Sequence, residues 1–208
     1  MSRYIEIDPE HIQDNKIKQA VDTLKKGGII VYPTDTVYAL GCDAFNTKAV
    51  ERLCQLKGVK SEKTKFSIIC DTISMIADYS KQIDNHVFKV MKKALPGPYT
   101  FILNASNKVP KLLQLKKKTI GIRIPSHPIP LKIVQELGNP IITTSIKDDD
   151  EVIEYSTDPW LIYERYENRV DIVIDAGTGN NEASTVIDCT EDDFTIVREG
   201  LGDIHQYI

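Results

Sequence analysis

The sequence predicts an α/β fold, a twisted mixed sheet flanked by helices, in a single domain over residues 1–208. Between residues 11 and 168, strand-like apolar runs alternate with amphipathic helical stretches, which favours a sheet covered by helices. Residues 171–208 hold three strand-like runs and no helical stretch, so we expect part of the sheet to be antiparallel. A hydrophobic share of 41% and a charged share of 27% are typical of a globular domain with a sizeable core.

Five stretches show the periodicity of an amphipathic helix. In the first, the apolar residues from Ile17 to Leu24 share one face, and Gly27 and Gly28 end the helix. Asp84 is a candidate N-terminal cap for the third. The expected helices cover residues 11–26, 47–57, 84–95, 128–137 and 158–168.

Short runs rich in β-branched and aromatic residues predict the strands. Glycine, proline or small polar residues bound most of these runs, as turns between strands require. The expected strands cover residues 29–32, 66–70, 99–103, 119–124, 140–144, 171–175, 184–188 and 194–198.

The composition excludes several classes of protein. The longest apolar runs, such as Phe101 to Leu103, are far shorter than the roughly 20 residues of a membrane span. The N-terminal residues contain no apolar segment of a signal peptide. We therefore expect a cytoplasmic protein with no membrane partner, and the sequence does not specify an oligomeric state.

The sequence holds no pattern of a P-loop or of a dinucleotide-binding glycine motif. Its cysteines and histidines have the spacing of neither a zinc site, a disulfide framework nor a catalytic triad. We therefore expect no metal site in the protein and no tightly bound cofactor. The cysteines are Cys42, Cys54, Cys70 and Cys189, and the histidines are His11, His86, His127 and His205.

Charge is unevenly distributed along the chain. The net charge of −4 argues against wholesale nucleic-acid binding. Lysines nevertheless cluster in 57–65 and in 108–118. A solvated loop is the simpler interpretation of either cluster, but two clusters leave room for an anionic ligand.

Polar side chains follow the first expected strand, where Pro33 precedes Thr34, Asp35 and Thr36. Ligands of open α/β sheets bind at the carboxyl ends of strands, which makes these residues a candidate site. A plain turn, in which Pro33 fixes φ and the polar side chains bind local backbone groups, is the alternative.

Three further segments end strands with hydrogen-bond donors. Arg123 lies in the apolar run TIGIRIP, residues 143–145 form the run TTS, and a C-terminal hairpin offers Ser184, Thr185 and Arg198. Snorkelling or turn formation explains each segment alone. Together they suggest a site that binds a polyanion. Such a site would stabilise a transition state through hydrogen-bond donors, and not through a nucleophile or a metal centre.

Six segments in this order resemble the YrdC/YciO family: YPTDTVYALGCDA, PGPYTFIL, TIGIRIPSHP, TSIK, STVIDCT and VREGLGD. They cover nearly the whole chain, and their details are most similar to the YciO branch. The chain ends at the last segment, so we expect no C-terminal extension domain.

The resemblance implies the YrdC-like fold with a large positively charged cavity. The best-understood members are threonylcarbamoyl-AMP synthases, which join L-threonine, bicarbonate and ATP into threonylcarbamoyl-AMP and release pyrophosphate. Mg²⁺ usually accompanies ATP in such sites. The product feeds N6-threonylcarbamoylation of adenosine in transfer RNA, and some members have been described as binding double-stranded RNA.

The resemblance also assigns roles to particular residues. It implies that L-threonine binds Thr34, Arg123, Thr143 and Ser184. It implies that ATP binds Lys57, Lys65, Thr119, Ser145 and Arg198, with Lys60 as a further candidate in the same loop. The implied catalytic residues are Lys57, Lys65 and Arg123.

Three positions depart from the family pattern. Val59 stands in place of an arginine, Lys147 in place of an asparagine, and Cys70 in place of a histidine near the amino-acid pocket. Lys60 or Lys63 is a candidate substitute for the missing guanidinium. Two alternatives to a synthase stay open: an RNA-binding module that uses the cavity and the lysines of 108–118, and an ATP-binding enzyme with another reaction.

Overall fold

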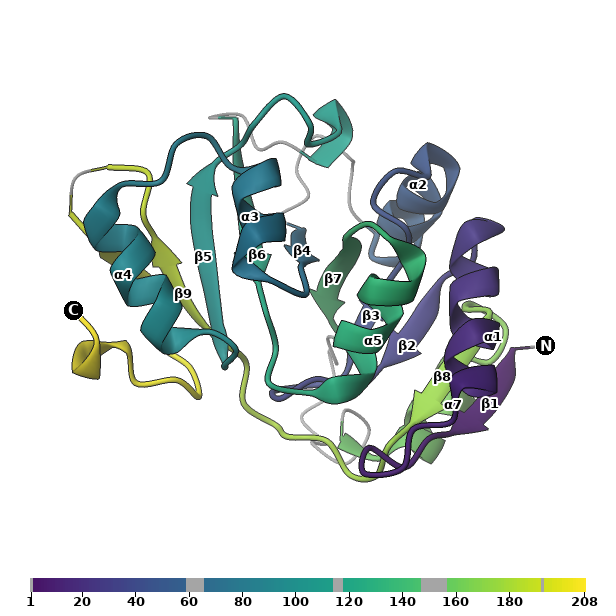
Figure 1. Ribbon diagram of the computed structural model, residues 1–208. Coiled ribbons are helices and arrows are strands. Elements are labelled where there is room, and N and C mark those ends of the chain that lie inside the picture. Colours follow the sequence, from purple (N-terminus) through teal and green to yellow (C-terminus); the bar gives the residue numbers. More distant parts are fainter. Residues whose placement is uncertain (1, 59–65, 114–117, 147–156, 192) are drawn as a thin grey trace.

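The computed structural model describes residues 2–58, 66–113, 118–146, 157–191 and 193–208. Within these ranges ten strands form one sheet in the order β1-β8-β2-β3-β7-β4-β6-β5-β9-β10. Figure 1 shows a strongly twisted sheet with helices packed against it. The strands are β1 (Arg3–Glu6), β2 (Ile30–Tyr32), β3 (Ala39–Gly41), β4 (Ser67–Ile69), β5 (Tyr99–Asn104), β6 (Thr119–Arg123), β7 (Ile141–Ser145), β8 (Ile172–Asp175), β9 (Thr185–Asp188) and β10 (Thr195–Arg198).

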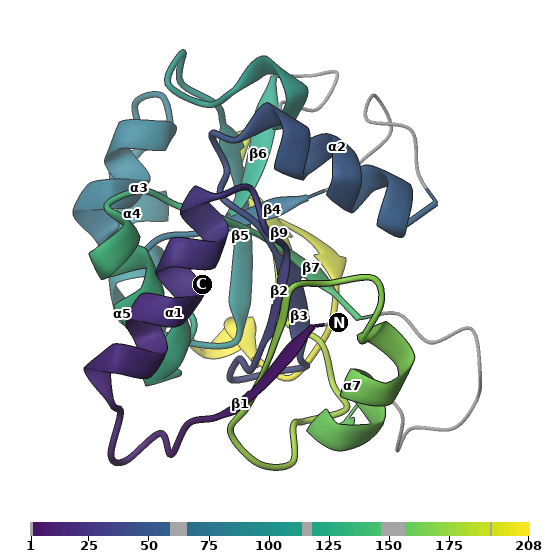
Figure 2. The same ribbon diagram turned by 90° about the vertical axis from the view of Figure 1, so that its right-hand side faces the viewer.

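Helices flank the sheet on both faces. In Figure 2, α1 and α5 lie on one side of the central strands, and α2 and α7 lie on the other. The helices are α1 (Asp14–Lys25), α2 (Thr47–Leu56), α3 (Ile73–Tyr79), α4 (Asn85–Ala94), α5 (Pro128–Leu137) and α7 (Pro159–Tyr166). Two short 3₁₀ helices cover Lys111–Leu113 and Ile204–Gln206.

The sheet combines parallel and antiparallel pairs, as the sequence predicts. β8 pairs in parallel with β1 and β2, β4 with β6, and β5 with β9. β3 pairs antiparallel with β2 and β7, β4 with β7, and β5 with β6. The antiparallel hairpin of β9 and β10 confirms the expectation for the C-terminal part of the chain, although β8 itself pairs in parallel.

Every expected strand and helix is present, but two strands, one α-helix and the two 3₁₀ helices were not expected from the sequence. β1 has a single buried side chain, Ile5, and therefore no apolar run. β3 has three residues and forms a sheet only by pairing with β2 and β7. α3 has seven residues, too few to show a helical period. Asp84 occupies the N-cap of α4, as the sequence predicts, but its side chain makes no capping hydrogen bond.

Buried apolar side chains form two clusters on opposite faces of the sheet. Ile30 and Tyr32 of β2 belong to the cluster under α1 and α5. Val31, between them, belongs to the larger cluster, which includes side chains of α2, α4 and α7. This alternation is that of a strand covered on both faces. No described helix has the length and apolar character needed to cross a membrane.

Candidate functional site

One face of the sheet, called the donor face below, carries most of the predicted site residues. Residues paired in register point to the same face of a sheet. Ser67 of β4 pairs with Gly121 of β6 and with Thr143 of β7, so these three residues share a face. Alternation along β6 adds Thr119 and Arg123 to it, and both are buried.

The donor face has two ends. Thr119 lies two residues from Gly121, and Ser145 lies two residues from Thr143, both toward the same end of these strands. Arg123 lies two residues beyond Gly121 in the opposite direction. Because a strand rises about 3.3 Å per residue, about 13 Å separates Thr119 from Arg123.

Arg123 is held at its end of the face by the loop that follows β2. Its Nη2 lies 2.6 Å from the Oδ1 of Asp35 and 3.2 Å from the hydroxyl oxygen of Thr36. The other carboxylate oxygen of Asp35 accepts a 2.8 Å hydrogen bond from the main-chain N of Ser126. The buried Nε of Arg123 has no hydrogen-bond partner among the described residues.

Thr34, the predicted substrate contact, uses its hydroxyl inside the loop. The hydroxyl donates to the carbonyl oxygen of Val37 at 2.7 Å and accepts from the main-chain N of Thr36 at 3.1 Å. It also lies 3.0 Å from the Thr36 hydroxyl. These bonds fill the capacity of a hydroxyl group. A direct bond from Thr34 to a substrate would therefore require one of them to open, and that role stays a prediction.

Arg198 lies at the Arg123 end of the face. Its Nε and Nη2 donate to the carbonyl oxygen of Ser184 at 3.1 and 2.6 Å. Burial and the nearby positive charge of Arg123 lower the pKa of Arg198. The sequence associates Arg198 with ATP and Ser184 with L-threonine, whereas the structure brings the two residues together.

Two donor-face hydroxyls were missed from the sequence. Thr100 is buried on β5, and its hydroxyl lies 2.8 Å from the hydroxyl of Ser184. Ser67 lies beside Gly121, where a Cβ atom would meet the Ser67 hydroxyl at 2.4 Å. The signal for Thr100 was the polar residue between Tyr99 and Phe101, and the signal for Ser67 was the only hydroxyl in the FSIIC run.

Lys57 reaches the other end of the face. It follows α2, and its Nζ donates a 2.9 Å hydrogen bond to the carbonyl oxygen of Ser145. In the second lysine cluster, Lys108 pairs with Asp78 at 2.6 Å. Five other residues named in the sequence analysis lie outside the described residues: Val59, Lys60, Lys63, Lys65 and Lys147.

Two further residues near the site, Cys70 and His127, are explained by their places in the fold. Cys70 is fully buried in the larger core cluster, and its main-chain N donates to the carbonyl oxygen of Arg123 at 3.0 Å. Burial raises the pKa of its thiol well above the usual range. His127 caps α5, because its Nδ1 accepts a 3.3 Å hydrogen bond from the main-chain N of Ile129. Burial lowers the pKa of His127, although the Asp35 carboxylate acts in the opposite direction.

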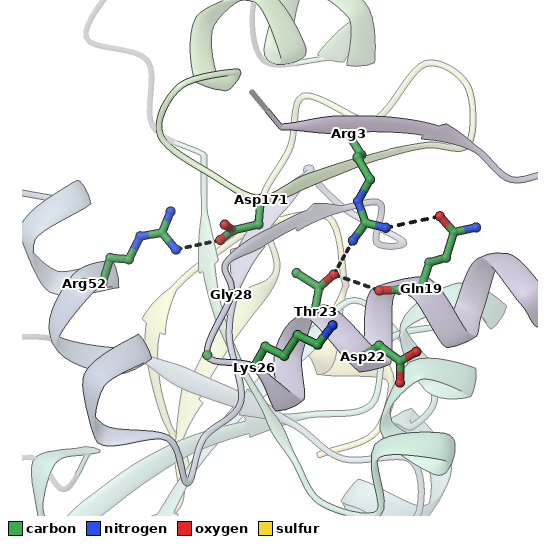
Figure 3. Close-up of a pocket in the computed structure, with 9 residues that line it drawn as sticks. Arg3, Gln19, Asp22, Thr23, Lys26, Gly28, Arg52 and Asp171 are labelled. Carbon is green, nitrogen blue, oxygen red and sulfur yellow. Dashed lines mark hydrogen bonds and ion pairs between the residues drawn. The ribbon is translucent and has the colours of Figure 1, made fainter.

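A surface pocket of about 490 Å³ lies away from the donor face, at the amino ends of β1, β2 and β8. Figure 3 shows Arg3 bound to Thr23 and Arg52 bound to Asp171, both at 2.6 Å. Thr34 follows the opposite, carboxyl end of β2. Arg52 and Asp171 form an ion pair in this pocket, and Arg3 also lies 3.4 Å from the side-chain oxygen of Gln19.

The described residues include no group of three or more His, Cys, Asp and Glu side chains that could hold a metal ion. The donor face offers instead two guanidinium groups, one ammonium group and several hydroxyls. Such a set binds carboxylate and phosphate oxygens.

A family model named Sua5_yciO_yrdC, with the description "Telomere recombination", matches residues 22–200. The Escherichia coli (strain K12) protein named "Uncharacterized protein YciO" is 41% identical over 210 residues, which cover all of both chains. A threonylcarbamoyl-AMP synthase from Coxiella burnetii is 30% identical over 82% of this chain and 90% of its own.

Solved structures agree with these matches. The crystal structure of E. coli YciO superimposes over all of both chains with a TM-score of 0.91 and 41% identity. The structure of Pyrococcus abyssi Sua5 complexed with L-threonine has a TM-score of 0.83 and 28% identity. That match covers 96% of this chain and 58% of the Sua5 chain.

Proposed function

The chain belongs to the Sua5/YciO/YrdC family, and we propose that it is an enzyme of the threonylcarbamoyl-AMP synthase type. It would join L-threonine, bicarbonate and ATP into threonylcarbamoyl-AMP and release pyrophosphate. The C. burnetii protein named threonylcarbamoyl-AMP synthase is 30% identical to this chain. The E. coli YciO protein is more similar, at 41% identity, but its name gives no activity.

The observation that carries the proposal is the buried Nε of Arg123, a cationic donor with no partner among the described residues. A buried donor left unpaired costs about 1–3 kcal/mol, so a ligand oxygen at this position would be stabilising. The carboxylate of L-threonine suits a guanidinium group at this end of the face. Thr143 and Ser184 would offer hydroxyls to the rest of the amino acid, and Thr34 would do so after its loop opens.

ATP would lie toward the other end of the face. Lys57 contacts Ser145 there, Thr119 lies at the same end of β6, and Lys60 and Lys65 follow Lys57 in the sequence. These are the residues we propose for ATP. Arg198, which the family resemblance assigns to ATP, lies at the opposite end beside Ser184, and we propose that it acts there by holding Ser184. The distance of about 13 Å between Thr119 and Arg123 would let a nucleotide and an amino acid lie along one strand. The donor face would then form a wall of the expected positively charged cavity.

The reaction would proceed in two steps. The threonine amine attacks the carbon of bicarbonate, a C–N bond forms, and water leaves to give a carbamate. A carbamate oxygen then attacks the α-phosphorus of ATP, and the bond to the β-phosphate oxygen breaks to release pyrophosphate. The donors would contribute by positioning both partners and by neutralising phosphate charge. Lys57, Lys65 and Arg123 are the proposed catalytic residues.

Mg²⁺ would enter with ATP and be held mainly by phosphate oxygens, as is usual for this ion. The product would serve N6-threonylcarbamoylation of transfer RNA, which makes transfer RNA an indirect partner. A direct role in RNA binding has less support, because the net charge of the chain is −4. In the second lysine cluster, Lys108 pairs with Asp78, and Lys116 and Lys117 lie outside the described residues. A cytoplasmic location stays a prediction.

Pyrophosphate release tests the proposal. The wild-type protein is incubated with ATP and Mg²⁺, and L-threonine or bicarbonate is omitted in turn. Release that requires both substrates supports the synthase. Release that is independent of L-threonine would contradict it and would favour another reaction of ATP. Arg123→Ala is expected to lower the threonine-dependent rate by at least about a hundredfold, the effect of losing a charged bond and leaving its ligand unpaired.

A further inference from the structure

Asp35 and Arg123 form an ion pair that is almost entirely shielded from solvent. The Nη2–Oδ1 distance is 2.6 Å, and the side chains of Arg123 and Asp35 are 7% and 9% exposed. The second carboxylate oxygen of Asp35 accepts the 2.8 Å bond from the main-chain N of Ser126. One oxygen therefore holds the guanidinium, and the other holds the turn that follows β6.

The guanidinium of Arg123 thus uses only some of its nitrogens in hydrogen bonds to the described residues. Its Nη2 is engaged twice, by Asp35 at 2.6 Å and by the hydroxyl of Thr36 at 3.2 Å. Its Nε is buried and has no hydrogen-bond partner among the described residues. The fixed geometry of the fork means that holding Nη2 also fixes the direction of the Nε–H bond.

We propose that Asp35 is a positioning residue, which holds Arg123 so that its Nε–H faces the carboxylate of the amino-acid substrate. This inference rests on the proposed function, because that function supplies the substrate. Asp35 acts through Arg123 and does not itself touch the amino acid. Its carboxylate also offsets the positive charge of Arg123, which lies near the charge of Arg198.

The alternative is that Asp35 occupies the site of the substrate carboxylate and is displaced on binding. The contacts of the loop oppose this alternative. Displacement would break the ion pair and leave a buried carboxylate without its charge partner, which is strongly unfavourable. The loop is also held elsewhere, because the main-chain N of Asn180 donates to the carbonyl oxygen of Thr36 at 3.1 Å.

Asp35→Asn tests the inference through the kinetics of the two substrates. Asparagine keeps the shape of the side chain but presents an amide donor either to Nη2 or to the Ser126 N–H, so one bond is lost. We expect the KM for L-threonine to rise about tenfold or more, the usual effect of a lost charge-assisted bond, with the KM for ATP nearly unchanged. Thr36→Val, which removes the longer bond to Nη2, should raise the threonine KM by a smaller factor.

Asp43→Asn is the matched control. Asp43 also accepts from a main-chain N, that of Phe45 at 2.9 Å, and from a side-chain donor, the Nδ2 of Asn139 at 2.8 Å. The Asp43→Asn variant should leave the KM for L-threonine unchanged. Thermal unfolding of each variant identifies loss of folded protein. An unchanged threonine KM in folded Asp35→Asn overturns the inference, and a lower KM does so as well because it indicates displacement.

A second measurement does not depend on turnover. The Nε–H resonance of Arg123 is assigned by NMR from its absence in Arg123→Lys, and its hydrogen exchange is measured without ligand. We expect exchange in Asp35→Asn to be about tenfold faster or more, as a lost charge-assisted bond implies, and unchanged in Asp43→Asn. Equal exchange in wild type and Asp35→Asn overturns the inference. If the wild type makes no threonylcarbamoyl-AMP, the proposed function fails and this measurement alone decides the role of Asp35.

Discussion

Arg198 donates two hydrogen bonds to the main-chain carbonyl oxygen of Ser184, from Nε at 3.1 Å and from Nη2 at 2.6 Å. The same Nη2 lies 3.3 Å from the Ser184 hydroxyl. A fork of this kind orients the hydroxyls of Ser184 and Thr100, which lie 2.8 Å apart. Arg198 therefore lies at the Arg123 end of the donor face, which is the end where we propose that the amino acid binds.

Arg198→Lys should raise the KM for L-threonine about tenfold, because a lysine cannot bind the Ser184 carbonyl with two nitrogens. Steady-state kinetics with each substrate varied in turn measure this effect. A rise confined to ATP would contradict the placement at the amino-acid end and would support a nucleotide contact. Arg52→Lys is the control, since it changes an ion pair of the distant pocket.

Gly121→Ala should destabilise the protein by about 1–3 kcal/mol, the usual cost of overpacking. A Cβ atom at this position would lie 2.4 Å from the hydroxyl oxygen of Ser67 and 3.3 Å from the Cγ2 of Thr100. Urea unfolding measures the change. Ser67→Ala removes the closest atom, so the double variant should recover part of the loss. Equal stability of the single variant and wild type would contradict the packing of the donor face.

The free energy of unfolding should fall as the pH is lowered below about 6.5, partly because of His127. Burial lowers the pKa of His127 in the folded protein, so the unfolded chain takes up a proton first. The neutral ring therefore stabilises the fold above the unfolded pKa, and this contribution is lost as the pH falls toward the folded pKa. Protonation would also remove the acceptor that caps α5.

His127→Asn isolates this effect, because asparagine keeps a capping oxygen and does not titrate. Urea unfolding at pH 7, 6 and 5 should show a smaller loss of stability in the variant than in wild type. The same loss in both proteins would exclude His127 as a cause.

Restoring the family residues should raise the synthase rate if the departures limit it. Val59→Arg adds a guanidinium that can bind phosphate oxygens with two nitrogens, and Lys147→Asn returns the amide of the family pattern. We expect the double variant to exceed wild type by about tenfold in kcat/KM for ATP, the worth of one charged contact. No change would mean that another residue, such as Lys60 or Lys63, already supplies the contact.

The sequence predicted most of the sheet because its strands carry their own apolar runs. It missed β1 and β3, where pairing with neighbouring strands, and not a local pattern, forms the element. It placed Arg123 on a strand, where the side chain could either snorkel outward or point inward to an anion. The partner it finds, Asp35, is 88 residues away in the chain, and no local spacing connects the two.

The donor face has a similar explanation. Thr119, Thr143 and Ser145 could be named from strand-end polarity and the family resemblance. Thr100 could not, because its contact with Ser184 depends on the parallel pairing of β5 and β9, which brings together residues 84 positions apart. Register decides such contacts, and register follows from the assembled sheet.

The most direct measurement is the identity of the product formed from ¹³C-bicarbonate, L-threonine and ATP. Mass spectrometry should detect threonylcarbamoyl-AMP that carries one ¹³C atom, and omission of any one substrate should abolish it. Arg123→Ala should reduce its yield, and Arg52→Lys should not. If ATP is consumed by wild type without ¹³C entering a nucleotide product, the chain is not a threonylcarbamoyl-AMP synthase.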